Sequence, residues 1–108
     1  MPETLTFTVT PKETTKDEYD WIDIDAPAAR VGKARCRIEG DTLTVFSIMI
    51  FPEYQGLGYG TRTIEMLKEQ YPVLVADRVR FTARHFWEKM GFAERPDGNW
   101  AYRRKPPG

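Results

Sequence analysis

The chain of 108 residues has little of what metals, disulfides or membranes require. It contains one cysteine, Cys36, and one histidine, His85. An internal disulfide is therefore excluded, and a structural zinc site with four nitrogen or sulfur ligands is not expected. No apolar run reaches the about 18 residues that cross a membrane. The start, Met1-Pro2-Glu3-Thr4, lacks the basic and apolar regions of a signal peptide. We expect a cytoplasmic protein without a bound metal.

The net charge is zero, but positive and negative residues are unevenly distributed along the chain. The chain has 16 Lys and Arg against 16 Asp and Glu; residues 1–50 carry −3 and residues 51–108 carry +3. The second half would face an anionic ligand, and the acidic stretch from Glu13 to Asp25 would face a cationic substrate or solvent. Zero net charge and a single short basic run near the C-terminus argue against a nucleic-acid-binding protein.

Length and a hydrophobic content of 41% predict one domain over residues 1–108. Alternating or continuous apolar residues predict strands at 5–10, 19–25, 30–39, 42–51, 73–76, 92–95 and 100–104. The run at 42–51 is the most apolar and is expected at the centre of the sheet. Helical spacing predicts two main helices, 59–70 and 81–90, which end at Pro72 and Gly91. The fold class is therefore α/β (α+β), with a meander of antiparallel strands in the first half.

The most informative feature that is present is the run Gln55-Gly56-Leu57-Gly58-Tyr59-Gly60. It follows a predicted strand and opens a predicted helix. Glycines let backbone N–H groups approach an anion, and the helix start adds unpaired donors, so this layout predicts a phosphate site. The alternating glycines fit neither the dinucleotide fingerprint nor the P-loop pattern. The alternative is an ordinary tight connection.

Two motifs together resemble the GNAT superfamily of N-acetyltransferases. Gln55, Gly58 and Gly60 fill the places of its acyl-CoA loop, and the segment from Ala83 to Phe92 resembles its second motif, an alanine-led helix that ends in Gly-Phe. The resemblance covers roughly residues 43–102. It implies a mixed, mostly antiparallel sheet of about six or seven strands, and acetyl-CoA as the cofactor. The helices that the family usually has between its first two strands are expected to be absent or vestigial here.

The resemblance also implies where coenzyme A binds. Pantetheine would lie in a V-shaped split between the strand ending near Ile50 and the strand 73–76, and the pyrophosphate would lie on the N–H groups of the glycine loop. The implied cofactor-binding residues are Ile48, Met49, Ile50, Gln55, Gly56, Leu57, Gly58, Tyr59, Gly60, Thr61, Arg80 and Trp87. Arg80, with Arg78 and Arg84, would contact the 3′-phosphate of the cofactor or form a solvated face.

The catalytic side chains that the family commonly uses are not in their usual places. Ser47 stands on the central strand where the family often has a carboxylate base, and Trp87 stands where it usually has a tyrosine acid. An indole N–H donates a hydrogen bond but is not an acid near neutral pH. The remaining catalytic candidates are Ser47, acting through water, and Tyr102, for which packing is the alternative. The first hypothesis is direct acetyl transfer to an amine held beside the thioester. The second is a coenzyme A sensor or regulatory module without catalysis.

The sequence leaves the acceptor open between a small-molecule amine and a peptide amine. Without the usual helices the acceptor side is expected to be open, or to be completed by another subunit in a homodimer. Trp21 with Asp20, Asp23 and Asp25 would form an acidic patch for a cationic acceptor, or a solvated surface. Cys36 lies on the apolar side of its strand and is expected to be a core residue rather than a nucleophile.

Overall fold

The computed structural model describes residues 4–16 and 18–105. Two predictions concern residues outside these ranges. One is the lack of signal-peptide features at the start, which includes residues 1–3, and the other is a C-terminal tail without helix or strand, which includes residues 106–108. The elements are β1 (Thr6–Thr10), α1 (Lys12–Thr15), β2 (Asp20–Asp25), β3 (Arg30–Glu39), β4 (Thr42–Ile50), the 3-10 turn η1 (Pro52–Tyr54), α2 (Tyr59–Gln70), β5 (Val73–Ala76), the 3-10 turn η2 (Phe81–Ala83), α3 (Arg84–Lys89), β6 (Ala93–Glu94) and β7 (Trp100–Arg103).

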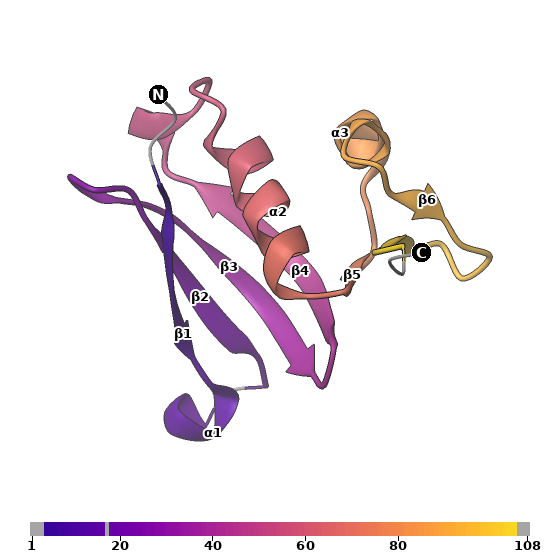
Figure 1. Cartoon of the computed structure of the whole chain (residues 1–108), viewed down its shortest axis with the longest axis horizontal. Helices are drawn as coiled ribbons and strands as arrows, with labels where there is room; N and C mark the ends of the chain where they lie inside the picture. Colours follow the sequence, from indigo (N-terminus) through magenta and orange to yellow (C-terminus); the bar gives the residue numbers. More distant parts are fainter. Residues whose placement is uncertain (1–3, 17, 106–108) are drawn as a thin grey trace.

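The strands form one seven-stranded sheet in the order β1-β2-β3-β4-β5-β7-β6, so β4 is central as predicted (Figure 1). Pairs from β1 to β4 are antiparallel, β4 and β5 are parallel, and the last strands are antiparallel again. The predicted mixed, mostly antiparallel sheet is confirmed. Among the described residues between β1 and β2, the one helix is the four-residue α1, which confirms that the helices usual at this point are reduced.

Two predicted boundaries were wrong. The second main helix was expected over residues 81–90, but Phe81–Ala83 form a 3-10 turn and the α-helix spans only Arg84–Lys89. The strand expected at 92–95 is limited to Ala93–Glu94. β6 is the edge strand of the sheet and α3 has only six residues, and such short elements are held by tertiary contacts rather than by their own propensity. α2 has the predicted bounds.

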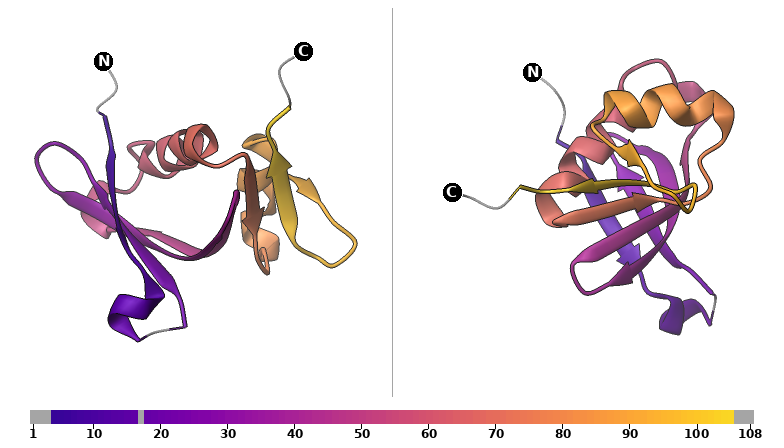
Figure 2. Two further views of the ribbon diagram at one scale, coloured as in Figure 1. Left: turned by 60° about the horizontal axis from the view of Figure 1, so that its bottom comes forward. Right: turned by 90° about the vertical axis from the view of Figure 1, so that its right-hand side faces the viewer.

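Alternation along the strands gives the β2–β4 part of the sheet two different faces. One face carries the buried aliphatic residues, including Ile22, Ile24 and Leu43, and α2 packs on it through Ile64 and Leu67. Figure 2 shows α2 lying over this part of the sheet. We call the other side the open face, because no described helix covers it. Its side chains are Trp21, Asp23, Asp25, Lys33, Arg35, Arg37, Ser47 and Met49.

A β-bulge on β4 interrupts the pairing of β3 and β4. Arg35 pairs with Ser47, but the next residue, Cys36, pairs with Val45, so Phe46 has no residue opposite it on β3. A bulge bends its strand and increases the local twist. β4 therefore turns away from its original direction at Phe46, and this bend matters for the neighbouring strand β5.

Candidate active site

β4 and β5 separate just after this bulge. Their parallel pairing covers only Thr42–Val45 and Val73–Ala76, and the last contact is the Asp77 N–H donating to the Val45 carbonyl at 2.9 Å. β5 then ends because Arg78 adopts a left-handed conformation with φ of 51°, which turns the chain toward η2. The edge of β4 from Phe46 to Ile50 is consequently left without a strand on the β5 side. This is the predicted split in the sheet.

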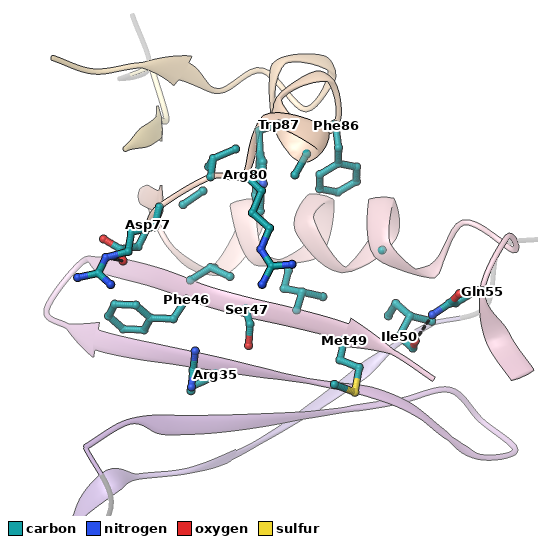
Figure 3. A pocket seen from close by; sticks show the side chains of 17 residues that line it. Arg35, Phe46, Ser47, Met49, Ile50, Gln55, Asp77, Arg80, Phe86 and Trp87 are labelled. Atoms are coloured by element: carbon teal, nitrogen blue, oxygen red, sulfur yellow. Dashed lines mark hydrogen bonds and ion pairs between the residues drawn. The ribbon is translucent and has the colours of Figure 1, made fainter. Parts of the chain in front are cut away.

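A cavity of about 660 Å³ occupies the split. Six consecutive residues of β4, from Val45 to Ile50, line it, although alternate residues of a strand point to opposite faces of a sheet. The cavity therefore follows the edge of β4 rather than one face. Figure 3 shows Gln55 and Asp77 at its opposite ends, with Ser47 and the side chain of Arg35 between them. Phe86 and Trp87 of α3 form the wall across from β4.

The glycine loop closes one end of the cavity. Gly56 and Gly58 have φ of 79° and 86°, a conformation that side-chain-bearing residues rarely adopt. Gly58 is the N-cap residue of α2, and the amides in the first turn of a helix have no carbonyl partner within that helix. The Gln55 side chain donates from Nε2 to the Ile50 carbonyl at 2.9 Å, which ties the loop back to the end of β4. This end offers main-chain donors and the positive end of a helix dipole.

The structure brings eight of the predicted site residues together around the cavity. They are Ser47, Ile48, Met49, Ile50, Gln55, Gly60, Arg80 and Trp87. The other predicted cofactor residues, Gly56, Leu57, Gly58, Tyr59 and Thr61, belong to the adjoining loop and first helical turn but do not line the cavity. Their binding roles remain predictions.

Tyr102 lies elsewhere. Its ring is 4.4 Å from Lys68 Nζ and 5.9 Å from the ring of Phe92, and the side chain borders a separate hollow of about 290 Å³ at the end of the sheet. It is not among the residues that line the split. The geometry therefore matches the packing alternative for Tyr102 and gives no support to a catalytic role.

Three charged or aromatic residues that line the cavity, Arg35, Phe46 and Asp77, were not predicted from the sequence. Asp77 is the carboxylate that lines the cavity, and it lies 3.7 Å from Arg78 Nε. A signal for Asp77 was present, since it is the first polar residue after a short buried strand beside the predicted split. Arg35 and Phe46 carried no such signal, because their placement depends on the bulge.

The structure removes Asp20 from the predicted acidic patch for a cationic acceptor. Asp20 is buried, and its carboxylate accepts the backbone N–H groups of Lys12 and Ile38 at 2.8 and 2.9 Å, so it holds β2 in place. Asp23 and Asp25 are ion-paired with Arg30 at 3.5 and 2.9 Å. The hydrogen bond to Asp25 and the charge of Asp23 raise the pKa of Arg30. These carboxylates already have partners within the chain.

Neither Cys36 nor His85 lines the cavity. Cys36 is fully buried, and burial raises the pKa of its thiol to about 12, so it is no nucleophile at neutral pH. His85 is exposed on α3. Among the described residues, no three His, Cys, Asp or Glu side chains gather as a metal site would require.

Comparison with known proteins agrees with this geometry. The model of the acetyltransferase (GNAT) domain matches residues 19–94, most of the chain, which therefore belongs to the GNAT superfamily of acetyltransferases. None of the helices in residues 4–16 and 18–105 is long and apolar enough to span a membrane.

Individual relatives carry acetyltransferase names. The chain is 33% identical over 79 residues to the uncharacterized N-acetyltransferase ycf52 of Pyropia yezoensis, covering 68% of this chain and 45% of that protein. It is 37% identical over 70 residues to the ribosomal protein bS18-alanine N-acetyltransferase of Haemophilus influenzae, covering 59% and 48%. The chain thus spans less than half the length of these relatives. The Escherichia coli putative N-acetyltransferase YhhK, solved bound to coenzyme A, shares the fold with a TM-score of 0.68 and 13% identity, over 95% of this chain and 99% of that chain.

Proposed function

We propose that the chain is an N-acetyltransferase that moves an acetyl group from acetyl-CoA directly to an amine. The observation that carries this proposal is the cavity along the free edge of β4, which joins a phosphate-type glycine turn at one end to polar side chains at the other. The coenzyme A bound to YhhK, which has the same fold, and the N-acetyltransferase names of the relatives support it.

The cofactor would be held mainly by the main chain. The diphosphate is bound by the amides of the glycine loop and the first turn of α2, which converge there without needing side chains. Pantetheine, which carries two amides, extends along the edge of β4 beside Ile48 and Ile50, in the place of the missing strand. Phe86 and Trp87 supply the apolar wall over it. The thioester then lies near Ser47, toward the Asp77 end of the cavity.

Asp77 is the group that takes up the proton in this proposal. The amine nitrogen attacks the thioester carbonyl carbon, the new C–N bond forms, and the C–S bond breaks. The nitrogen gives up a proton to the Asp77 carboxylate, directly or through a water held by Ser47. The products are the N-acetylated amine and coenzyme A. The carboxylate thus directly follows β5 and does not stand on β4, where the family often has its base.

With Trp87 in place of the tyrosine that the family usually has, no side chain at this position can protonate the leaving thiolate. A simple thiol has a pKa near about 8.5, so its thiolate is a tolerable leaving group without an acid beside it. Solvent then supplies the proton to sulfur after the bond breaks. This accounts for catalysis with an indole lining the cavity at this point.

The proposal is tested by calorimetric titration with acetyl-CoA and coenzyme A. Gly60 lines the cavity, and a Cβ added there meets nothing within 4 Å, so Gly60→Trp fills the cofactor path without backbone strain. The matched control is Glu65→Trp, an exposed position on the same helix. Micromolar binding by the wild type and the control, with at least about a hundredfold loss in Gly60→Trp, is expected. Unchanged binding in Gly60→Trp contradicts the proposed site.

The second candidate is a coenzyme A sensor without turnover. It is favoured by Trp87 and by the lack of a carboxylate on β4. Release of free thiol from acetyl-CoA in the presence of a panel of amines separates the two functions. Binding without any amine-dependent thiol release identifies the sensor.

A further inference from the structure

β3 presents a row of cations on the open face, and each of them lies over an aromatic ring. Lys33 Nζ is 5.3 Å from the centre of the Trp21 ring, Arg35 Cζ is 4.7 Å from that of Tyr19, and Arg37 Cζ is 5.4 Å from that of Phe46. Such stacking fixes a cation on a ring while leaving its N–H groups available. Of the three, only Arg35 lines the cavity.

Arg35 stacks on the Tyr19 ring but has no ion-pair partner among the described residues. Its Nε is buried and has no hydrogen-bond acceptor within the part of the chain that the structure describes. No ion pair joins it to a described carboxylate, because Asp23 and Asp25 on the same face are taken by Arg30. A partly buried guanidinium is nearly always paired. The missing partner is therefore expected to come from outside the chain.

The charge of the cavity points the same way. Arg35, Arg78 and Arg80 line it together with one carboxylate, Asp77, which is paired with Arg78. Arg80 reaches into the cavity from the η2 side, where the cofactor would lie (Figure 3). Arg35 approaches instead from β3, opposite Ser47 in the sheet register and next to the Phe46 bulge. It thus reaches the cavity from the open face, between the glycine loop and Asp77 and close to Ser47, where the amine would lie beside the thioester.

We propose that Arg35 recognises a carboxylate on the acceptor, so that the substrate is an amino acid or another small amine that carries a carboxylate close to its nitrogen. The inference rests on the proposed acetyl transfer. The acceptor nitrogen lies between Asp77 and the thioester, and its carboxylate lies on the guanidinium of Arg35. A planar guanidinium binds a carboxylate through two parallel N–H donors, which an ammonium does not reproduce.

The test compares matched acceptors. Thiol release from acetyl-CoA is measured with amino acids and with the corresponding amino acid amides, which keep the amine and lose the negative charge. We expect at least one amino acid to be acetylated with a kcat/KM at least about tenfold above that of its amide. Arg35→Gln should raise KM for that amino acid by about 10- to 100-fold, leave kcat nearly unchanged, and leave the amide unaffected. Arg35→Lys should recover only part of the affinity.

Two controls keep the outcome specific. Arg37→Gln removes the next cation of the row, which does not line the cavity, and should leave both acceptors unchanged. Coenzyme A affinity should be the same in Arg35→Gln and the wild type. Equal use of amino acids and amides by the wild type, or an equal rise in KM for both in Arg35→Gln, overturns the inference while acetyl transfer stands. Thiol release with none of the amines overturns the proposed function and this inference with it.

Discussion

The two ends of the cavity differ in the chemical groups that line them. The end at the glycine loop is made of main-chain groups, namely the amides around Gly58 and the free edge of β4. The part from Ser47 to the Asp77 end is made of side chains, with Arg35, Phe46 and Asp77 reaching it from β3, from β4 and from the turn after β5. The two ends are therefore sensitive to different kinds of substitution. The first end is damaged by adding atoms or by changing φ, and the second is damaged by removing a functional group.

The largest effect is expected at the side-chain end. Asp77→Asn keeps the shape of the residue and removes its capacity to take up a proton, so kcat should fall by about 100- to 10,000-fold. Coenzyme A affinity should stay within about twofold of the wild type, as titration would measure. Glu69→Gln, an exposed carboxylate on α2, is the matched control and should be fully active. Full activity in Asp77→Asn would remove the residue from the mechanism.

Trp87→Tyr addresses the wall between the two ends. Tyrosine would place an O–H beside the leaving thiolate, where the wild type has no acidic group. If protonation of sulfur contributes to the barrier, kcat should therefore rise by about tenfold. Trp87→Phe, which adds no proton donor, should not show this rise. Steady-state rates of thiol release for the two variants decide the point. Equal rates would mean that departure of the thiolate does not limit turnover.

At the main-chain end, Gly58→Ala is expected to lower the stability of the fold and the affinity for coenzyme A, with a smaller effect than that of Asp77→Asn on kcat. Gly58 has φ of 86°, and an L residue in this conformation costs about 1–2 kcal/mol of unfolding free energy. Gly98→Ala provides the comparison, because Gly98 has φ of 87° in the turn between β6 and β7. Chemical denaturation should show similar losses for both variants. Only Gly58→Ala should also weaken coenzyme A binding, by about tenfold, and equal affinities would argue that the loop does not hold the diphosphate.

The smallest effect should come from a residue at neither end. Arg84 Nη2 and Glu94 Oε2 form an ion pair at 2.8 Å, but both side chains are about half exposed, at 41% and 48%. Exposed pairs contribute about 0–1 kcal/mol, so Glu94→Gln should change the free energy of unfolding by less than about 1 kcal/mol. Coenzyme A affinity and kcat should not change. A large loss of activity would show that α3 is positioned by this pair.

The two ends also differ in how far the sequence predicts them. The glycine run and the helix after it form a local pattern, so α2 and the loop could be predicted from consecutive residues, whereas the cofactor residues of β4 were implied by the family resemblance. Arg35 and Phe46 come together through a bulge in a pairing between two strands, and single-sequence periodicity does not encode a bulge. Asp77 meets them only because β5 pairs in parallel with β4 for four residues. The strand order and the placement of these side chains depend on contacts between distant parts of the chain, so they could not be predicted from the sequence alone.

The seam between β4 and β5 has a consequence for how the molecule holds together. On one side, β1 to β4 are hairpin neighbours close in sequence; on the other, β5 to β7 reach β4 through four paired residues. Contacts between segments distant in the chain form later in folding than local hairpins. A ligand lying in the seam would touch both sides and would bind only when they have docked. At a hundred times its dissociation constant, such a ligand adds about 2.7 kcal/mol to the stability of the folded chain. The bound cofactor would thus stabilise the association of the two parts of the sheet, which the short β4–β5 pairing alone holds weakly.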